Sequence, residues 1–315
     1  MRSRRARNAV GLSALVIGLT TAAVAQAQLD GAQDALDAAG SSWNFGNTNG
    51  VRRPPLSLIP EGEADRSVSG FGLDDAALSP LGPAVDTSAT LWINDLQFAS
   101  DSFSTSNGIL TAGPVVTQGV SVTVQHSLVI NAPVLRSLIS FTNSSGSPVT
   151  LNELEWIFSE VGGDENATRH TASGDAIFNV DDRWTISSDT DGTTPPTVPV
   201  VLYVLYGPGS PLETTSSAAV RVYQVGAPSN FQRGMQAIFG PITVPAGTTR
   251  RLLFFTGLYQ TNEHALAASA AFSQLTSCAF FGIPTDQYNQ ILNWTLSTGN
   301  PADECVRVNL TSLQR

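Results

Sequence analysis

The fold is decided by the stretch Val120-Ser121-Val122-Thr123-Val124-Gln125-His126-Ser127-Leu128, which has the clearest alternation of apolar and polar residues in the chain. A period of two is typical of a β-strand whose two faces meet different surroundings. The valines and His126 share the face that we expect on the core. The serines, Thr123 and Gln125 share the face that we expect in solvent.

Working outward, short apolar segments separated by Gly, Pro, Asn, Asp and Ser continue over residues 89–259. Two of them, 198–206 and 252–255, are apolar on both faces, which is typical of central strands covered on both sides. Turn clusters at 142–148 and 245–249 each lie between two strand-like segments. We therefore expect an antiparallel hairpin around each turn.

The apolar period changes to three and four after residue 261, which predicts two short helices over about 261–295, the first capped by Asn262. Residues 28–88 are rich in Gly, Pro, Ser and Asn and are expected to form an irregular N-terminal arm. The sequence thus predicts an all-β fold. We expect one large, mostly antiparallel β-sandwich domain over 89–315 with a C-terminal helical cap.

The first 27 residues have the three zones of a secretory signal peptide: a basic start, an apolar stretch over 9–24, and small residues before Gln28. A membrane anchor needs about 20 apolar residues, and this run is shorter. We expect cleavage after Ala27 and an exported chain that is periplasmic, extracellular or at the cell surface. No later segment is apolar for long enough to predict a transmembrane helix in the mature chain.

The net charge indicates which classes of partner are not expected, and the two cysteines bear on disulfide formation. The chain has 16 basic and 26 acidic side chains and a net charge of −10, so nucleic acid and anionic membrane surfaces are not expected partners. Its two cysteines, Cys278 and Cys305, both lie in the exported part. An even pair there favours a disulfide, with two buried free thiols as the alternative.

The chain has three histidines, and their spacing matches no zinc motif. His126 occupies the apolar register of its strand. We therefore interpret it as a core histidine bonded to a backbone carbonyl. The alternative is that this face lines a cleft in which His126 acts as a general acid or base.

Ten of the 26 acids lie between residues 153 and 191, and a solvated acidic surface is the simplest interpretation. Asp189 and Asp191 are candidate ligands for a structural calcium ion, because calcium prefers oxygen ligands that alternate in such a loop. Glu153 and Glu155 are candidate catalytic carboxylates of a glycoside hydrolase, since residues two apart share a strand face. No other cofactor is expected.

Two tryptophans, Trp156 and Trp184, sit in strand-like segments beside the acidic loops. A tryptophan ring can stack on a sugar, so both are candidate ligand-binding residues. Most tryptophans in strands belong to the core, which is the alternative for each.

Residues 135–163 comprise an arginine-bearing strand, the turn Phe-Thr-Asn-Ser-Ser-Gly, and a strand leading to Val161-Gly162-Gly163-Asp164. This succession resembles bacterial secreted β-sandwich proteins of the large galactose-mutarotase-like supersandwich type and covers under a quarter of the chain. The resemblance implies a β-sandwich of a class in which many members bind or process carbohydrate. Enzymes of that class use histidine and acidic residues in the concave sheet, but neither His126 nor Glu155 aligns with them, so no residue role is carried over.

Together these observations predict a secreted, non-catalytic binding or surface-structural protein, with carbohydrate or other envelope proteins as candidate partners. The alternative is an extracellular carbohydrate-active enzyme that uses His126 with a carboxylate from 153–191. A third possibility is an envelope component that assembles through sheet edges.

Overall fold

The computed structural model describes residues 33–36, 41–51, 68–81, 83–100, 102–106, 108–129, 132–158, 167–215, 221–222, 235–275 and 277–296. Within these residues the chain forms antiparallel sheets with a few short helices, which confirms the all-β prediction. The expected signal peptide over 1–27 lies outside the described residues. So does Cys305, and with it the expected disulfide.

An eight-stranded sheet organises the fold, and its strand order is β13-β14-β15-β19-β10-β9-β8-β7. Its strands are β7 (Phe103–Ser106), β8 (Ile109–Thr117), β9 (Val120–Leu128), β10 (Val134–Thr142), β13 (Ala167–Thr171), β14 (Trp184–Ser188), β15 (Val200–Val204) and β19 (Thr249–Tyr259). The two segments that were expected to be central are β15 and the middle of β19. Both are buried on both faces, as predicted.

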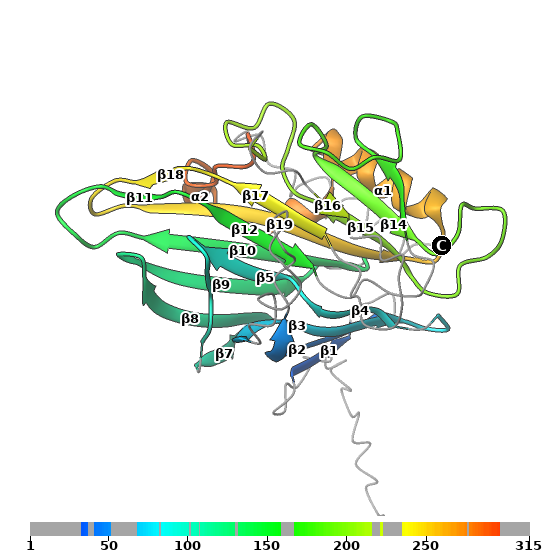
Figure 1. The fold of residues 1–315 in the computed structure, drawn as a ribbon, viewed down its shortest axis with the longest axis horizontal. Helices are drawn as coiled ribbons and strands as arrows, with labels where there is room; N and C mark the ends of the chain where they lie inside the picture. Colours follow the sequence, from blue (N-terminus) through cyan, green and yellow to red (C-terminus); the bar gives the residue numbers. More distant parts are fainter. Residues whose placement is uncertain are drawn as a thin grey trace, which may run out of the picture.

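Three smaller sheets complete the strand framework, and Figure 1 shows the four-stranded one as the lowest layer. The five-stranded sheet contains β5 (Thr90–Ile93), β6 (Leu96–Gln97), β12 (Leu154–Phe158), β16 (Arg221–Val222) and β17 (Met235–Phe239). The two-stranded sheet pairs β11 (Val149–Leu151) with β18 (Ile242–Val244). The four-stranded sheet contains β1 (Gln33–Leu36), β2 (Ser41–Val51), β3 (Val68–Leu78) and β4 (Pro83–Ser88).

The inner face of the eight-stranded sheet packs against the smaller sheets in one continuous hydrophobic core. Trp156 of the five-stranded sheet stacks on Phe254 of β19 with ring centroids 4.9 Å apart. Val122 and Val124 of β9 lie in the same core, on the face that the alternation predicted. The sandwich therefore closes through large side chains contributed by distant parts of the chain.

Residues 28–88 are not the irregular arm that we expected. Their described part forms the four-stranded sheet, and Trp43, Phe45 and Leu73 are buried in the main core. Several Gly, Ser and Asn residues that suggested an irregular segment, such as Asn44, Gly46 and Gly70, lie within strands. These strands are held by core contacts and ladder pairing, which override the weak local preference of such residues.

The two expected hairpins are also wrong. β10 pairs with β9 and β19, whereas β11 pairs with β18, so each turn carries the chain from one sheet to another. The buried Asn143 holds these two corners together, because its Nδ2 donates to the carbonyls of Ser147 (2.8 Å) and Val244 (2.9 Å). The turn residues change the direction of the chain. The strand that pairs with the next segment is decided by where that segment can bury its apolar side chains.

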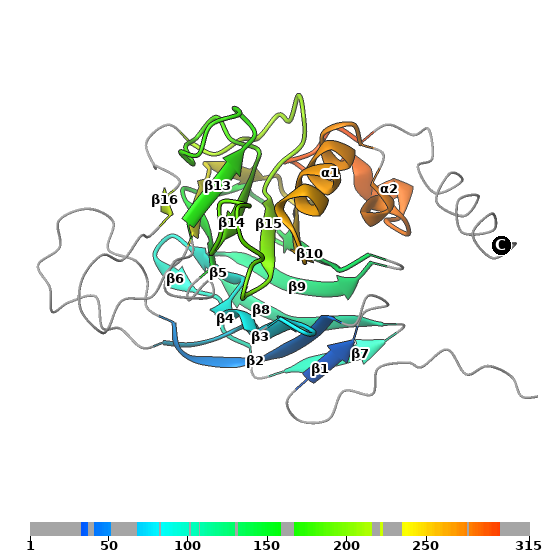
Figure 2. The same ribbon diagram turned by 90° about the vertical axis from the view of Figure 1, so that its right-hand side faces the viewer.

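The expected helical cap is present as α1 (Asn262–Ser273), the short 3-10 helix η1 (Cys278–Phe280) and α2 (Thr285–Tyr288). Thr261, and not Asn262, caps α1, since its side chain accepts from the His264 N–H. The cap packs on the outer face of β14, β15 and β19 through a second core around Phe255 (Figure 2).

Among the described helices, none combines the length and the apolar character that crossing a membrane would require.

Candidate functional site

The outer face of the eight-stranded sheet is covered by the cap at one end and carries uncharged polar side chains at the other. We call the polar part the hydroxyl face, and its residues are Ser104, Ser106, Thr111, Ser121, Thr123, Gln125 and Ser127. Each is at least partly exposed. Strand register places them in rows, such as Ser104, Thr111 and Gln125, that continue across β10 to Leu253 beneath the cap.

The hydroxyl face offers hydrogen-bond donors and acceptors but no charge. β7, β8 and β9 contain no Asp, Glu, Lys or Arg. Neighbouring strands lie about 4.8 Å apart, and outward residues repeat about every 6.7 Å along a strand, so the side chains form a flat grid. Within it, Gln125 Nε2 donates to Thr111 Oγ1 at 3.3 Å, which leaves the other hydrogen-bonding positions of both groups available.

At the border between the hydroxyl face and the cap lies Arg136 of β10. Its Nε donates to Ser127 Oγ at 3.0 Å, and its Nη1 donates to the Phe281 carbonyl at 2.6 Å. Phe281 itself leaves 37% of its surface exposed. The border therefore brings the backbone of an exposed aromatic residue to Arg136 at the edge of the polar grid. Hydroxyl and aromatic side chains in one region suit a ligand with both hydroxyls and apolar C–H surface.

His126 lies on the opposite, inner face of β9. It is 1% exposed, its Nδ1 is hydrogen-bonded to Ser137 Oγ at 2.9 Å, and its ring stacks on Phe45 with centroids 4.9 Å apart. Desolvation by burial lowers the pKa of His126 from 6.5 to about 3. The residue is thus a neutral core histidine, bonded to a side chain instead of the backbone carbonyl that we expected.

The carboxylates Glu153 and Glu155 meet a third one, Asp95, at one end of the five-stranded sheet. One oxygen of each residue lies within 4.8 Å of the others. Asp95 belongs to the tight turn between β5 and β6, and the preceding Asn94 secures the turn by accepting from the backbone N–H of Glu153 at 3.0 Å. Oxygens this close can hold a divalent cation or share a proton.

The three carboxylates differ in access. Asp95 is exposed, whereas Glu155 is 1% exposed and accepts a hydrogen bond from the buried Gln236. Glu155 points away from the main core, because its strand neighbours Leu154 and Trp156 point into it. His126 faces that core, so the five-stranded sheet separates it from Glu155, and the structure does not bring these two residues of the enzyme alternative together.

The carboxylates of Asp189 and Asp191 are engaged by their own loop. Asp191 accepts from the Thr193 backbone N–H at 2.9 Å and from its hydroxyl at 2.6 Å. Asp189 accepts from the Thr197 backbone N–H at 2.8 Å. The hydrogen bonds from Thr193 also lower the pKa of Asp191. These contacts order the loop, and the structural calcium ion stays a prediction.

The two tryptophan candidates lie in different surroundings. Trp156 is 1% exposed in the main core and presents no ring face to a ligand. Trp184 begins β14 and is partly buried against the second core, beside the cap. The structure brings neither next to the hydroxyl face.

The sequence analysis did not identify Asp95 or Arg136 as site residues. It also did not recognise the polar face of β9 as part of a candidate site. The turn pair Asn94-Asp95 was a signal for Asp95, since both residues have positive φ (46° and 66°) in a two-residue hairpin turn. The alternation in 120–128 already marked the polar face. Only strand order shows that β7 and β8 extend it with further hydroxyls.

No protein-family model matches the sequence, and no curated protein matches it. Among solved structures, a galactose mutarotase-like protein from Lactobacillus casei ATCC 334 is 8% identical with a TM-score of 0.40, covering 73% of this chain and 100% of that protein. A polysaccharide lyase is 11% identical with a TM-score of 0.38 over 69% of this chain. The match spans 33% of the lyase. The mutarotase-like match is consistent with the resemblance inferred from residues 135–163, and at these TM-scores neither match carries an argument about activity.

Proposed function

We propose that this is an exported, non-catalytic β-sandwich protein that binds carbohydrate on the hydroxyl face. The observation that carries the proposal is the grid of uncharged hydroxyl and amide side chains on β7, β8 and β9, bordered by the exposed Phe281. Sugars present hydroxyls that both donate and accept, together with apolar C–H patches. Ser, Thr and Gln side chains match the hydroxyls, and an aromatic ring matches the patches.

The placement of the ionisable groups favours binding over turnover. A glycosidase needs two carboxyl groups, or an acid and a base, that a substrate can reach. His126 is sealed in the core, and Glu155, the most buried member of the Asp95–Glu153–Glu155 cluster, is 1% exposed. Asp95 and Glu153 are more accessible but belong to a different sheet from the hydroxyl face.

The proposal is tested by incubating the mature protein with a panel of insoluble and immobilised polysaccharides and measuring both retained protein and new reducing ends. Parallel samples contain calcium or a chelator. We expect retention on at least one polysaccharide without new reducing ends. New reducing ends would overturn the non-catalytic proposal, and no retention on any polymer would favour a surface-structural role.

A pair of matched variants locates the binding surface. Thr123→Ala removes a hydroxyl from the hydroxyl face, and Thr243→Ala removes one from an exposed position on β18 of the two-stranded sheet. We expect Thr123→Ala to weaken retention several-fold and Thr243→Ala to leave it unchanged. Equal retention by both variants would place the binding surface elsewhere.

A further inference from the structure

Arg136 is held entirely by neutral acceptors. It occupies an outward position of β10, between Ser127 on β9 and Phe255 on β19. Its Nε donates to Ser127 Oγ at 3.0 Å, and its Nη1 donates to the carbonyls of Phe281 (2.6 Å) and Ala279 (3.3 Å). Its remaining nitrogen, Nη2, donates to none of the described residues. The guanidinium is thus fixed in position with one edge unused.

No carboxylate of the described residues forms an ion pair with Arg136. Acids are not scarce, because the chain has 26 of them against 16 basic residues. Partly buried charges in proteins are usually paired with an opposite charge. Burial lowers the pKa of Arg136, which measures the desolvation of its charge, yet a guanidinium keeps its proton at any ordinary pH. A desolvated cation without a counter-charge is suited to receive one from a ligand.

The neighbouring Arg251 provides a contrast on the same outer face. It lies opposite Ser140 of β10, and its Nε donates to Gln290 Oε1 at 3.0 Å. Burial lowers the pKa of Arg251, and the charge of Asp286 on α2 opposes part of that lowering. No carboxylate charge from the described part of the chain acts on Arg136, so Arg136 is the stronger anion-binding position.

We propose that Arg136 binds an oxyanion group, a carboxylate or a sulfate, carried by an acidic polysaccharide that lies on the hydroxyl face. This inference rests on the proposed function and specifies its ligand class. The fixed guanidinium provides the charge-assisted hydrogen bonds, the hydroxyls of the grid bind the sugar hydroxyls, and Phe281 lies next to the anion site. The overall charge of −10 opposes polyanions, so recognition depends on this one local contact and not on long-range attraction.

The test compares polymers that differ only in charge. Retention of the full mature chain is measured on polygalacturonate against its fully methyl-esterified form, and on dextran sulfate against dextran. The first pair tests a carboxylate and the second a sulfate. We expect the charged member of at least one pair to be bound about tenfold more tightly, and added salt to reduce the difference.

Three variants locate the charge preference. Arg136→Gln removes the guanidinium, Arg136→Lys keeps the charge without the planar fork, and Arg250→Gln removes an equal charge from the opposite face of β19. We expect Arg136→Gln to abolish the preference for the charged polymer, and Arg250→Gln to retain it. Since Arg136 also joins β10 to the cap, thermal unfolding checks that each variant is folded. If Arg136→Gln does not fold, Arg136→Lys decides, with an expected partial loss.

The outcomes separate this inference from the proposed function. Retention of neutral and charged polymers to the same extent would overturn the anion site and leave carbohydrate binding standing. A charge preference that survives in the Arg136 variants would also overturn the assignment to Arg136. Failure to retain any polymer would overturn both.

Discussion

The outer face of the eight-stranded sheet has a covered half and an open half, although one continuous set of antiparallel strands builds both. In the covered half, Leu202, Leu253 and Phe255 point outward and are buried by the cap. In the open half, most outward positions carry polar side chains such as Thr111 and Gln125, and the exposed Val116 beside Ser121 has no cap above it. The difference teaches that outward side chains decide whether a sheet face is buried under a cap or stays open to solvent.

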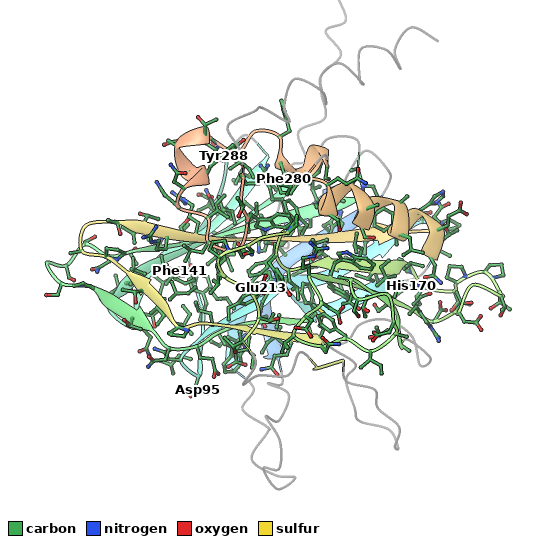
Figure 3. The ribbon with its side chains drawn as sticks, turned by 90° about the horizontal axis from the view of Figure 1, so that it is seen from above. Asp95, Phe141, His170, Glu213, Phe280 and Tyr288 are labelled. Atoms are coloured by element: carbon green, nitrogen blue, oxygen red, sulfur yellow. The ribbon has the colours of Figure 1, made fainter. Side chains whose placement is uncertain are left out.

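The covered half is held by packing between aromatic rings. Phe255 contacts the rings of Phe272, Phe280 and Trp294 at centroid distances of 4.8, 5.2 and 5.5 Å. The carboxylate cluster around Asp95 is remote from this arrangement, and Figure 3 shows Asp95 on the opposite side of the molecule from Phe280 and Tyr288. The helical cap, the hydroxyl face and the carboxylate cluster thus occupy three separate regions.

The largest effect is expected at the centre of the covered half. Phe255→Ala should lower the free energy of unfolding by about 3–5 kcal/mol, because it leaves a cavity among packed rings. Gln125→Ala, the control in the open half, should change it by less than about 0.5 kcal/mol. Urea denaturation followed by tryptophan fluorescence measures both. Similar losses would contradict the division into two halves.

The inner face beneath the open half is also buried, and it contains His126. The free energy of unfolding should therefore depend on keeping His126 uncharged, and a change of pH tests this. The pKa of His126 is about 3 in the folded protein and 6.5 in the unfolded chain. The unfolded state therefore binds more protons between these values, and stability falls as pH falls through that window. The expected slope is about 1.4 kcal/mol per pH unit.

His126→Leu provides the control for this slope, since it removes the titrating group while keeping an apolar side chain. The difference in free energy of unfolding between the wild type and His126→Leu should change by about 2 kcal/mol between pH 6.5 and pH 5. Denaturant unfolding at both pH values measures it. Parallel pH curves for the two proteins would show that His126 does not cause the pH dependence.

A smaller effect is expected at the start of the cap. Thr261→Ala removes the hydroxyl that caps α1 and should cost about 1 kcal/mol, whereas Thr261→Ser should retain most of the stability. Hydrogen exchange of the first-turn amides of α1 measures the local loss. Unchanged protection in Thr261→Ala would mean that packing on β14, β15 and β19 fixes the helix without the cap.

The smallest effect on stability is expected from making the open half resemble the covered one. The double variant Thr123→Val with Gln125→Leu should unfold at nearly the same denaturant concentration but self-associate, because a new apolar patch has no cap above it. Light scattering measures the association, and Thr243→Val on β18 is the control. A variant that stays monomeric would show that two apolar residues are too few to convert the surface.

Parts of the site were predictable and parts were not. The alternation in 120–128 identified the core position of His126 and the polar grid of β9, because alternation depends only on strand geometry. Asp95 could not be joined to Glu153 and Glu155, because 58 residues separate Asp95 from Glu153 and only the β5–β12 pairing brings them together. The lack of a carboxylate beside Arg136 among the described residues was equally beyond sequence reasoning, since pairing depends on which acids fold nearby.

The sequence by itself determined the all-β class, the central strands β15 and β19, and the helical cap, because these follow from local periodicity and from runs of apolar residues. The tertiary structure decided which strands pair. It formed a sheet from the described part of 28–88 and made corners between sheets of two apparent hairpins. The physical reason is that turn chemistry is local, whereas a strand's partner is chosen by the apolar area that the whole chain can bury.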